Sequence, residues 1–132
     1  MKINRSTGYA LIAVGFIALN SSDRSVLAAE ISKEYGIPLE YLLKILQMLV
    51  RANILRSKRG PGGGFSLAKN SEQITLLDIV ETVEGSLDGS MHLAKQGNNH
   101  AFCLKIEDIY RNATDHVKEL YSNARLSDIL AE

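Results

Sequence analysis

The chain lacks the features that mark several protein classes. It has a single cysteine in 132 residues, so it cannot form an internal disulfide framework, and this fits a reducing cytoplasm. An apolar run from Tyr9 to Leu19 covers only eleven residues, which is too short to cross a bilayer as a helix. The 15 basic and 15 acidic residues cancel, so there is no net charge. The length and the ordinary apolar content indicate one compact domain, or a small domain with an appended helix.

The first twenty residues allow two interpretations. Lys2 and Arg5 before the short apolar run are typical of a secretory signal peptide. However, Ser6 or Thr7 can cap a helix, and the next segment continues directly into another helical pattern. We therefore expect a buried first helix over residues 6–19 in a cytoplasmic protein without a membrane segment, with the signal peptide as the alternative.

The neutral total conceals an uneven distribution of charge. Residues 1–69 contain ten lysines and arginines against four acidic residues, a net of +6. Residues 70–132 contain five against eleven, a net of −6. A basic half favours a polyanionic partner, and an acidic half favours a separate role such as pairing or sensing. Ordinary surface variation is the alternative.

Two short helical patterns follow the first one. Ser25 is a good cap for a helix over residues 26–35. Gly36 supplies the left-handed residue that ends this helix, and Pro38 suits the first turn of the next one, over residues 38–52. Two short helices joined by such a turn form a helix-turn-helix.

The helix predicted over residues 38–52 has an apolar and a polar face. The apolar face carries Leu42, Ile45, Leu46 and Leu49. The polar face carries Glu40, Lys44, Gln47 and Arg51, at spacings of four, three and four. A face that combines cations, an amide and a carboxylate can contact base edges in a major groove. A face that is merely solvated is the alternative.

A glycine-rich segment separates two strand-like stretches. Residues 54–58 and 65–68 are short enough for the strands of a hairpin, and Arg59-Gly60-Pro61-Gly62-Gly63-Gly64 joins them as a projecting tip. Glycines let a backbone approach phosphates, and Arg59 can enter a minor groove or bind the DNA backbone. An enzyme that cradles a nucleotide phosphate is disfavoured, because the loop lacks the lysine and hydroxyl residue of a P-loop and no catalytic constellation accompanies it.

The second half of the chain begins with one clear helix and an irregular segment. Thr75 with Asp78 resembles a capping box that opens a helix over residues 75–84, and Gly85 closes it. Residues 86–102 have no clear periodicity, which indicates an exposed loop.

The long helix predicted over residues 104–123 carries an apolar stripe at roughly heptad spacing. Its members are Ile106, Ile109, Ala113, Val117, Leu120 and Ala124. So small a domain offers this stripe no obvious partner, so pairing with a second chain is the economical solution. Packing on the chain's own core is the alternative. A short helix over residues 126–130 follows.

Several motifs together resemble one family of bacterial regulators. They are Gly8-Tyr9-Ala10, Ile37-Pro38-Leu39-Glu40-Tyr41-Leu42, the segments 59–67 and 74–80, and Leu126-Ser127-Asp128-Ile129-Leu130. They span almost the whole chain and are similar to those of the winged helix-turn-helix regulators that include IscR, NsrR and CymR. The resemblance implies a mainly α fold with a small β-hairpin wing and a long C-terminal dimerisation helix. It divides the chain into a DNA-binding domain at 1–84, a sensor-type loop at 85–103, and dimerisation and C-terminal helices at 104–132.

The resemblance also implies a homodimeric, sequence-specific transcription regulator of double-stranded DNA. Its third helix would lie in a major groove and its wing in a flanking minor groove. The positions carried over to this chain are Leu39, Glu40, Leu43 and Lys44 in the helix, Arg59 and Gly60 in the wing, and Arg5, Ser6 and Tyr9 as phosphate contacts. Leu43 is either a methyl contact to thymine or part of the core. A winged helix that binds only other proteins is the alternative function.

The sensor-type loop departs from the family pattern. Cluster-binding members resemble one another in three cysteines before the long helix, whereas this chain has only Cys103, with His92 in the place of the first cysteine. His92, His100 and Cys103 could hold a metal or an atypical iron–sulfur cluster. Cys103 could instead be a thiol redox switch. The third interpretation is an exposed loop whose histidines bind nothing and a buried Cys103, so the cofactor and the signal stay unknown.

Overall fold

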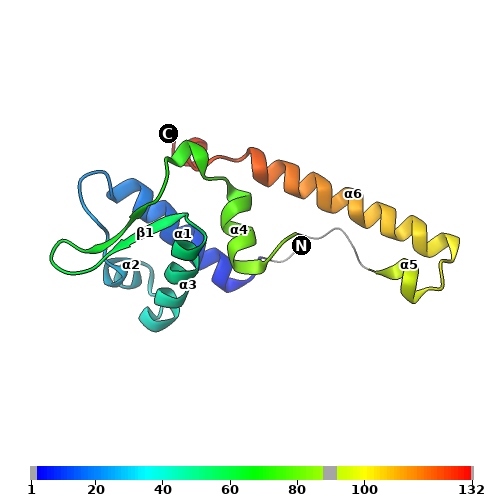
Figure 1. The fold of residues 1–132 in the computed structure, drawn as a ribbon, viewed down its shortest axis with the longest axis horizontal. Helices are drawn as coiled ribbons and strands as arrows, with labels where there is room; N and C mark the ends of the chain where they lie inside the picture. The colour runs from blue at the N-terminus through cyan, green and yellow to red at the C-terminus, as the bar shows by residue number, and fades with distance from the viewer. Residues whose placement is uncertain (1–2, 88–91, 132) are drawn as a thin grey trace.

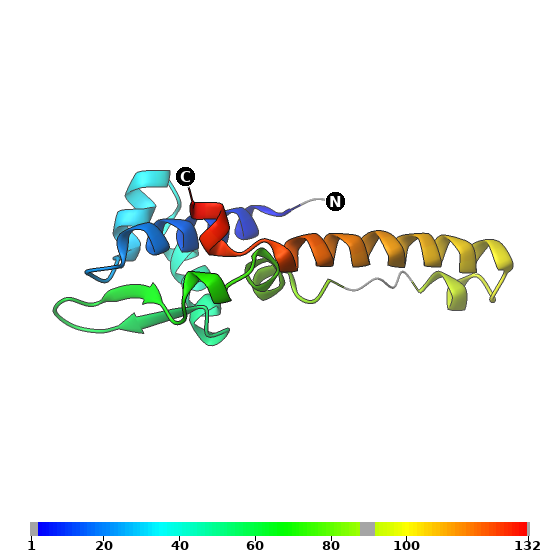
Figure 2. The ribbon, with the colours of Figure 1, turned by 90° about the horizontal axis from the view of Figure 1, so that it is seen from above.

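The computed structural model describes residues 3–87 and 92–131, which form a head and a projecting arm (Figure 1, Figure 2). The head consists of α1 (Arg5–Asn20), α2 (Ala28–Tyr35), α3 (Leu39–Arg51), β1 (Leu55–Lys58), β2 (Gly64–Leu67), the 3-10 helix η1 (Ser71–Gln73), α4 (Leu76–Glu84) and α7 (Leu126–Leu130). The arm consists of α5 (Leu93–Gln96) and α6 (Ala101–Asn123). This architecture confirms the mainly α fold with a small β-hairpin. Within the described ranges, no helix is both long and apolar enough to span a membrane.

Helix α1 is the central helix of the head. Its fully buried face consists of Ala10, Ala13, Val14 and Ile17, and α3, α4 and β2 pack against it. The helix begins at Arg5 because the Asn4 side-chain oxygen accepts the backbone N–H of Thr7 at 3.0 Å. The predicted caps, Ser6 and Thr7, therefore lie inside the helix rather than at its start.

Helix α2 begins two residues later than predicted, because Val26 pairs with the wing. The N–H of Val26 donates to the Phe65 carbonyl at 2.8 Å, and the N–H of Phe65 donates to the Val26 carbonyl at 2.7 Å. Val26 is therefore extended, and the helix starts only at Ala28. The predicted cap, Ser25, is too far upstream to serve.

A carboxylate stabilises the start of α2 in place of the predicted serine. Glu30 accepts the backbone N–H of Leu27 at 2.7 Å and pairs with the Arg24 guanidinium at 3.0 Å. The hydrogen bond from Arg24 and then that from Leu27 hold the pKa of Glu30 below its ordinary value, against a smaller opposing effect of desolvation. The ionised form of Glu30 thus favours the folded state.

The predicted helix-turn-helix and hairpin are both present. Gly36 has a φ of 66° at the end of α2, and Pro38 directly precedes α3. The antiparallel strands β1 and β2 follow, with Leu55 opposite Leu67 and Lys58 opposite Gly64. The wing therefore projects from the C-terminal end of α3 (Figure 1).

The predicted capping box opens α4. The Thr75 hydroxyl oxygen accepts the backbone N–H of Asp78 at 3.1 Å, and the Asp78 carboxylate accepts the N–H of Thr75 at 2.9 Å. Gly85, with a φ of 86°, ends the helix as predicted.

The arm is attached to the head at its C-terminal end. Helix α6 has 23 residues, which corresponds to a length of about 34 Å. The N–H of Leu76 donates to the Ala124 carbonyl at 2.8 Å, and the N–H of Leu126 donates to the Ile74 carbonyl at 2.8 Å. Leu126 is buried, so α7 rejoins the core. The rest of α6 extends past the head, with α5 beside its far end (Figure 1, Figure 2).

The predicted irregular segment 86–102 contains more structure than its sequence indicates. Helix α5 occupies four of its residues, and α6 begins at Ala101 rather than at residue 104. Asn98 and Asn99 have φ angles of 54° and 60° and form the turn between the two helices. Residues 88–91 of the predicted sensor-type loop lie outside the described residues.

Candidate nucleic-acid interface

Helix α3 presents the polar face that its sequence predicts. Leu42, Leu46 and Leu49 are fully buried and Ile45 nearly so, and this face packs on α1 and the rest of the core. Glu40, Lys44, Gln47 and Arg51 are all exposed. Their exposure agrees with a role in DNA binding, which stays a prediction.

The N-terminal half of α3 also exposes apolar side chains. Leu39 is 42% exposed and Leu43 is 37% exposed. Leu43 is therefore not part of the core, which leaves the methyl contact to thymine as its predicted role. An exposed leucine pair beside Glu40 and Lys44 gives this end of α3 a partly apolar surface.

Two glycines of the wing are required by the protein's own backbone. A Cβ atom on Gly63 would lie 2.4 Å from the Lys58 carbonyl oxygen, and one on Gly64 would lie 2.6 Å from the Val26 carbonyl oxygen. Gly64 also has a φ of 133°, which side chains rarely allow. The sequence interpretation, that these glycines serve the approach to phosphates, is therefore incomplete, because they first allow the wing to close.

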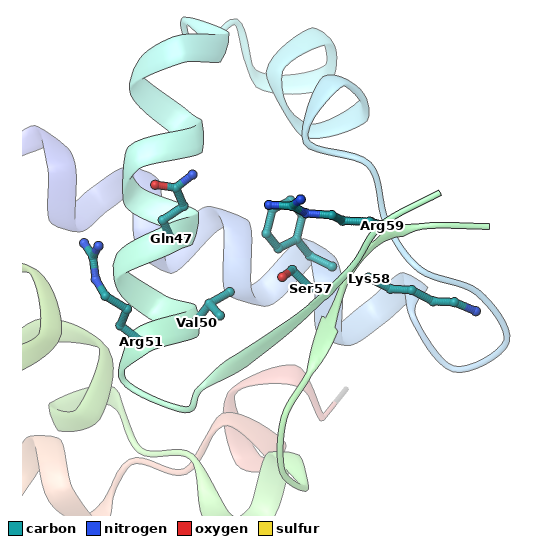
Figure 3. A pocket seen from close by; sticks show the side chains of 8 residues that line it. Gln47, Val50, Arg51, Ser57, Lys58 and Arg59 are labelled. Atoms are coloured by element: carbon teal, nitrogen blue, oxygen red, sulfur yellow. The ribbon is translucent and has the colours of Figure 1, made fainter. Parts of the chain in front are cut away.

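A cleft lies between α3 and the wing (Figure 3). It is lined by Gln47, Val50 and Arg51 from α3 and by Ser57, Lys58, Arg59, Gly64 and Phe65 from the hairpin. Figure 3 shows the Arg59 side chain extending toward α3, whereas Lys58 points away from it. The lining includes amide, hydroxyl and guanidinium donors and no carboxylate. The sequence does not single out Val50, Ser57 or Phe65 as site residues; Ser57 and Phe65 reach α3 only because the hairpin folds beside it.

The starts of α1 and α3 meet through two tyrosines. The rings of Tyr9 and Tyr41 are 5.7 Å apart between centroids and nearly perpendicular. The hydroxyl groups of Ser6 and Tyr41 form a hydrogen bond, and Arg5 lines a depression beside both rings. The predicted phosphate contacts Arg5, Ser6 and Tyr9 thus lie together. Tyr41 holds two of them in place.

The predicted dimerisation stripe lies on an exposed face of α6. Ile106 is 44% exposed, Ile109 is 70% exposed and Leu120 is 69% exposed. Ala113 is also exposed and Val117 is half-buried. The neighbouring face is different: Cys103, Glu107 and Thr114 are buried, and Glu107 accepts the backbone N–H of Leu93 at 3.2 Å. Among the described residues, the chain's own core therefore leaves most of the stripe exposed, with Val117 and Ala124 half-buried near its C-terminal end.

The three predicted sensor residues occupy separate environments. Cys103 is buried, and its sulfur lies so close to Gly97 that a Cβ there would be 2.3 Å from it. The ring of His100 stacks on Phe102, with centroids 5.9 Å apart. His92 precedes α5 with a φ of 58°. Over residues 3–87 and 92–131, no group of three or more histidine, cysteine, aspartate or glutamate side chains is placed to hold a metal ion.

Comparison with known proteins relates the chain to transcription regulators. The family model described as Rrf2, iron-dependent transcriptional regulator, matches residues 3–132. The HTH-type protein BadM of Rhodopseudomonas palustris is 45% identical over 84 residues, which are 64% of this chain and 53% of BadM. The HTH-type transcriptional regulator IscR of Sodalis glossinidius is 29% identical over 131 residues, which are 99% of this chain and 79% of IscR.

The same comparison extends to solved structures. The oxidised form of CymR from Staphylococcus aureus matches 100% of this chain and 98% of its own, with a TM-score of 0.81 and 23% identity. At that identity the likeness shows the fold alone. The chain spans about half the length of BadM and about four fifths of IscR.

The donor set of the described residues does not fit an iron–sulfur cluster. Such clusters are usually held by four thiolates, with histidine as the common substitute. This chain supplies one thiol, Cys103, which is enclosed against Gly97. The family description includes the word iron-dependent, but the described residues of one chain do not bring together a set of side chains that could hold iron.

Proposed function

Because the chain belongs to the Rrf2 family of transcriptional regulators, we propose that it binds specific sequences of double-stranded DNA as a homodimer. It is a DNA-binding winged-helix regulator and not an enzyme. In the proposed complex, each subunit inserts the N-terminal half of α3 in a major groove and its wing in the flanking minor groove.

One observation carries the DNA-binding proposal: the exposed face of α3 continues across a carboxylate-free cleft into the wing. Three cations, Arg51, Lys58 and Arg59, line this cleft. They belong to the half of the chain that has a net charge of +6. Such a surface attracts a polyanion such as DNA.

The homodimer is supported by the arm. An apolar stripe on α6 that its own head does not cover costs free energy in water, and a second copy of the same stripe can bury it. A two-fold pairing of the arms also carries two heads, as expected for a regulator that binds two half-sites.

Two measurements test this function. A pool of random-sequence duplexes is first selected with the purified protein, and binding of the selected duplex is then titrated against salt. We expect the logarithm of the association constant to fall linearly with the logarithm of the salt concentration, because several phosphates are neutralised. Absence of duplex enrichment, or binding that salt does not weaken, would favour the protein-interaction module instead.

The donor set leads to an expectation for the purified protein. One enclosed thiol per chain does not form a cluster site, so we expect protein purified without oxygen to be colourless and free of iron and still to bind the selected duplex. A visible absorption band with stoichiometric iron would contradict this expectation.

A further inference from the structure

We propose that the cleft between α3 and the wing seats the DNA strand that separates the two grooves, with Arg51 and Ser57 binding its phosphates. This inference rests on the proposed function. It changes the predicted role of Arg51, and of Gln47 beside it. Instead of contacting base edges, both residues would contact the sugar–phosphate backbone.

The position of the cleft follows from the shape of the duplex. A major groove and the adjacent minor groove are separated by one sugar–phosphate strand. If α3 occupies the first groove and the wing the second, that strand must pass between them. The cleft lined by Gln47, Arg51 and Ser57 is the surface between these two elements (Figure 3).

The length of α3 places Arg51 outside the base-contacting region. Leu39 and Arg51 are the first and last residues of the helix, which separates them by about 18 Å along its axis. A major groove is only about 12 Å wide. If α3 enters the groove with its N-terminal end first, Leu39, Glu40 and Lys44 reach the floor of the groove and Arg51 is at its rim, where phosphates lie.

The lining of the cleft is chemically complementary to the sugar–phosphate surface of a nucleotide. Val50 and Phe65 are partly buried and give the cleft an apolar floor, which suits the deoxyribose. Arg51, Ser57 and Arg59 are exposed and supply guanidinium and hydroxyl donors, and backbone phosphates take most of their contacts from such groups. The absence of a carboxylate among the lining residues removes the main source of repulsion.

The spacing between the two walls of the cleft is fixed before DNA arrives. The N–H of Ile54 donates to the Leu49 carbonyl at 3.0 Å, and the N–H of Asn53 donates to the Val50 carbonyl at 3.0 Å. Asn53 has a φ of 61°, so a tight left-handed turn joins α3 to β1. A preformed site loses little conformational entropy on binding.

The test compares two arginine substitutions. Arg51→Gln removes the cation from the cleft, whereas Arg56→Gln removes the same charge from the opposite face of β1, where Arg56 lines a different depression with Ser66 and Lys69. These two variants and a third, Ser57→Ala, are each titrated with the selected duplex at several salt concentrations. We expect Arg51→Gln to reduce the salt slope by about two per dimer, one phosphate for each head, and Arg56→Gln to reduce it less.

A second measurement locates the contact on the DNA. Single phosphates of the selected duplex are replaced by uncharged methylphosphonates. We expect wild-type binding to weaken at one phosphate per half-site, on the strand between the two contacted grooves, and Arg51→Gln to be insensitive to replacement there. Equal slopes for Arg51→Gln and Arg56→Gln, or sensitivity that Arg51→Gln retains, would overturn the inference while wild-type binding still supports the proposed function. Circular dichroism of each variant confirms that the exposed substitutions leave the fold intact.

Discussion

At the scale of single residues, the glycines of the wing are required for different physical reasons. Gly63 and Gly64 are forced by close approach to backbone oxygens, whereas a Cβ on Gly62 would meet no atom within 4 Å. Gly62 is selected only by its φ of 71°. Glycines that look equivalent in the sequence thus differ in how strongly the fold requires them, and only the structure shows this difference.

Gly64→Ala should destabilise the protein by about 2 kcal/mol or more, because the φ of 133° is strained and the new methyl group meets the Val26 carbonyl at 2.6 Å. The free energy of unfolding, measured by chemical denaturation at one fixed protein concentration, checks this. Gly15→Ala is the matched control: it lies within α1 with nothing within 4 Å, so it should stabilise by about 0.5–1 kcal/mol. Similar effects of the two substitutions would contradict the close contact.

Lys44→Ala and Arg59→Ala should differ in what they change. Lys44 lies on the half of α3 that we propose contacts base edges, so its loss should alter the sequence selected from a random pool and cost about 1–3 kcal/mol at one base pair. Arg59 belongs to the wing, and its loss should weaken binding to the selected duplex without unfolding the head. If Lys44→Ala weakens all duplexes equally, Lys44 is a phosphate contact.

At the scale of elements, local signals predicted the fold better than distant ones. The capping box of α4 and the two faces of α3 depend on residues three or four apart, and both are confirmed. The start of α2 was predicted wrongly because Val26 pairs with Phe65, a residue 39 positions later. Helix α5 was missed because four residues carry too little periodicity to be recognised.

The same reasoning applies to the candidate site. Exposure of Glu40, Lys44, Gln47 and Arg51 could be predicted from helical spacing, and the structure agrees. The cleft could not, because the proximity of Ser57 and Phe65 to α3 depends on the turn at Asn53 and on strand register. The proposed role of Arg51 as a phosphate contact depends on the length of α3 and on the position of the wing.

The start of α2 should make stability depend on acid pH. Pairing with Arg24 and Leu27 lowers the folded-state pKa of Glu30, so this stabilisation is present above the ordinary pKa near 4.5 and is lost as the pH falls through the lowered value. Glu30→Gln should therefore cost about 0.5–1 kcal/mol at pH 7 and progressively less on acidification. Thermal melting of both proteins from pH 7 to pH 3 checks this. Glu34→Gln, on an exposed site of the same helix, should change little at any pH; a pH-independent effect of Glu30→Gln would contradict the pairing.

At the scale of the whole molecule, charge is distributed unevenly along the chain. The half that contains the helix-turn-helix and wing carries +6, and the half that contains the arm carries −6. The arm itself, over residues 93–123, contains four basic and four acidic residues, so much of the acidic excess lies in the head, at Asp78, Glu81 and Glu84 of α4. Phosphates would therefore attract the helix-turn-helix and the wing, and this attraction orients that side of the head toward DNA before any specific contact forms.

Ile109→Glu should prevent dimerisation without unfolding the chain. Ile109 is 70% exposed in the single chain, so a carboxylate there is tolerated by the fold but would be buried in a pair of arms. Sedimentation velocity should show a monomer, and affinity for a two-half-site duplex should fall to the level of one head. Asn112→Glu adds the same charge off the stripe and should remain a dimer. A dimeric Ile109→Glu would place the interface elsewhere.

The pairing of Val26 with Phe65 has a consequence for the wing as a sheet. A hairpin of two strands is marginally stable in water, and its outer edges can recruit strands of other chains. By hydrogen bonding to β2 from outside, Val26 gives the hairpin a third backbone partner and occupies part of one such edge. The glycine-rich tip can then stay open to solvent while the strand pair directly behind it, at Ser57 and Phe65, resists fraying and edge-to-edge aggregation.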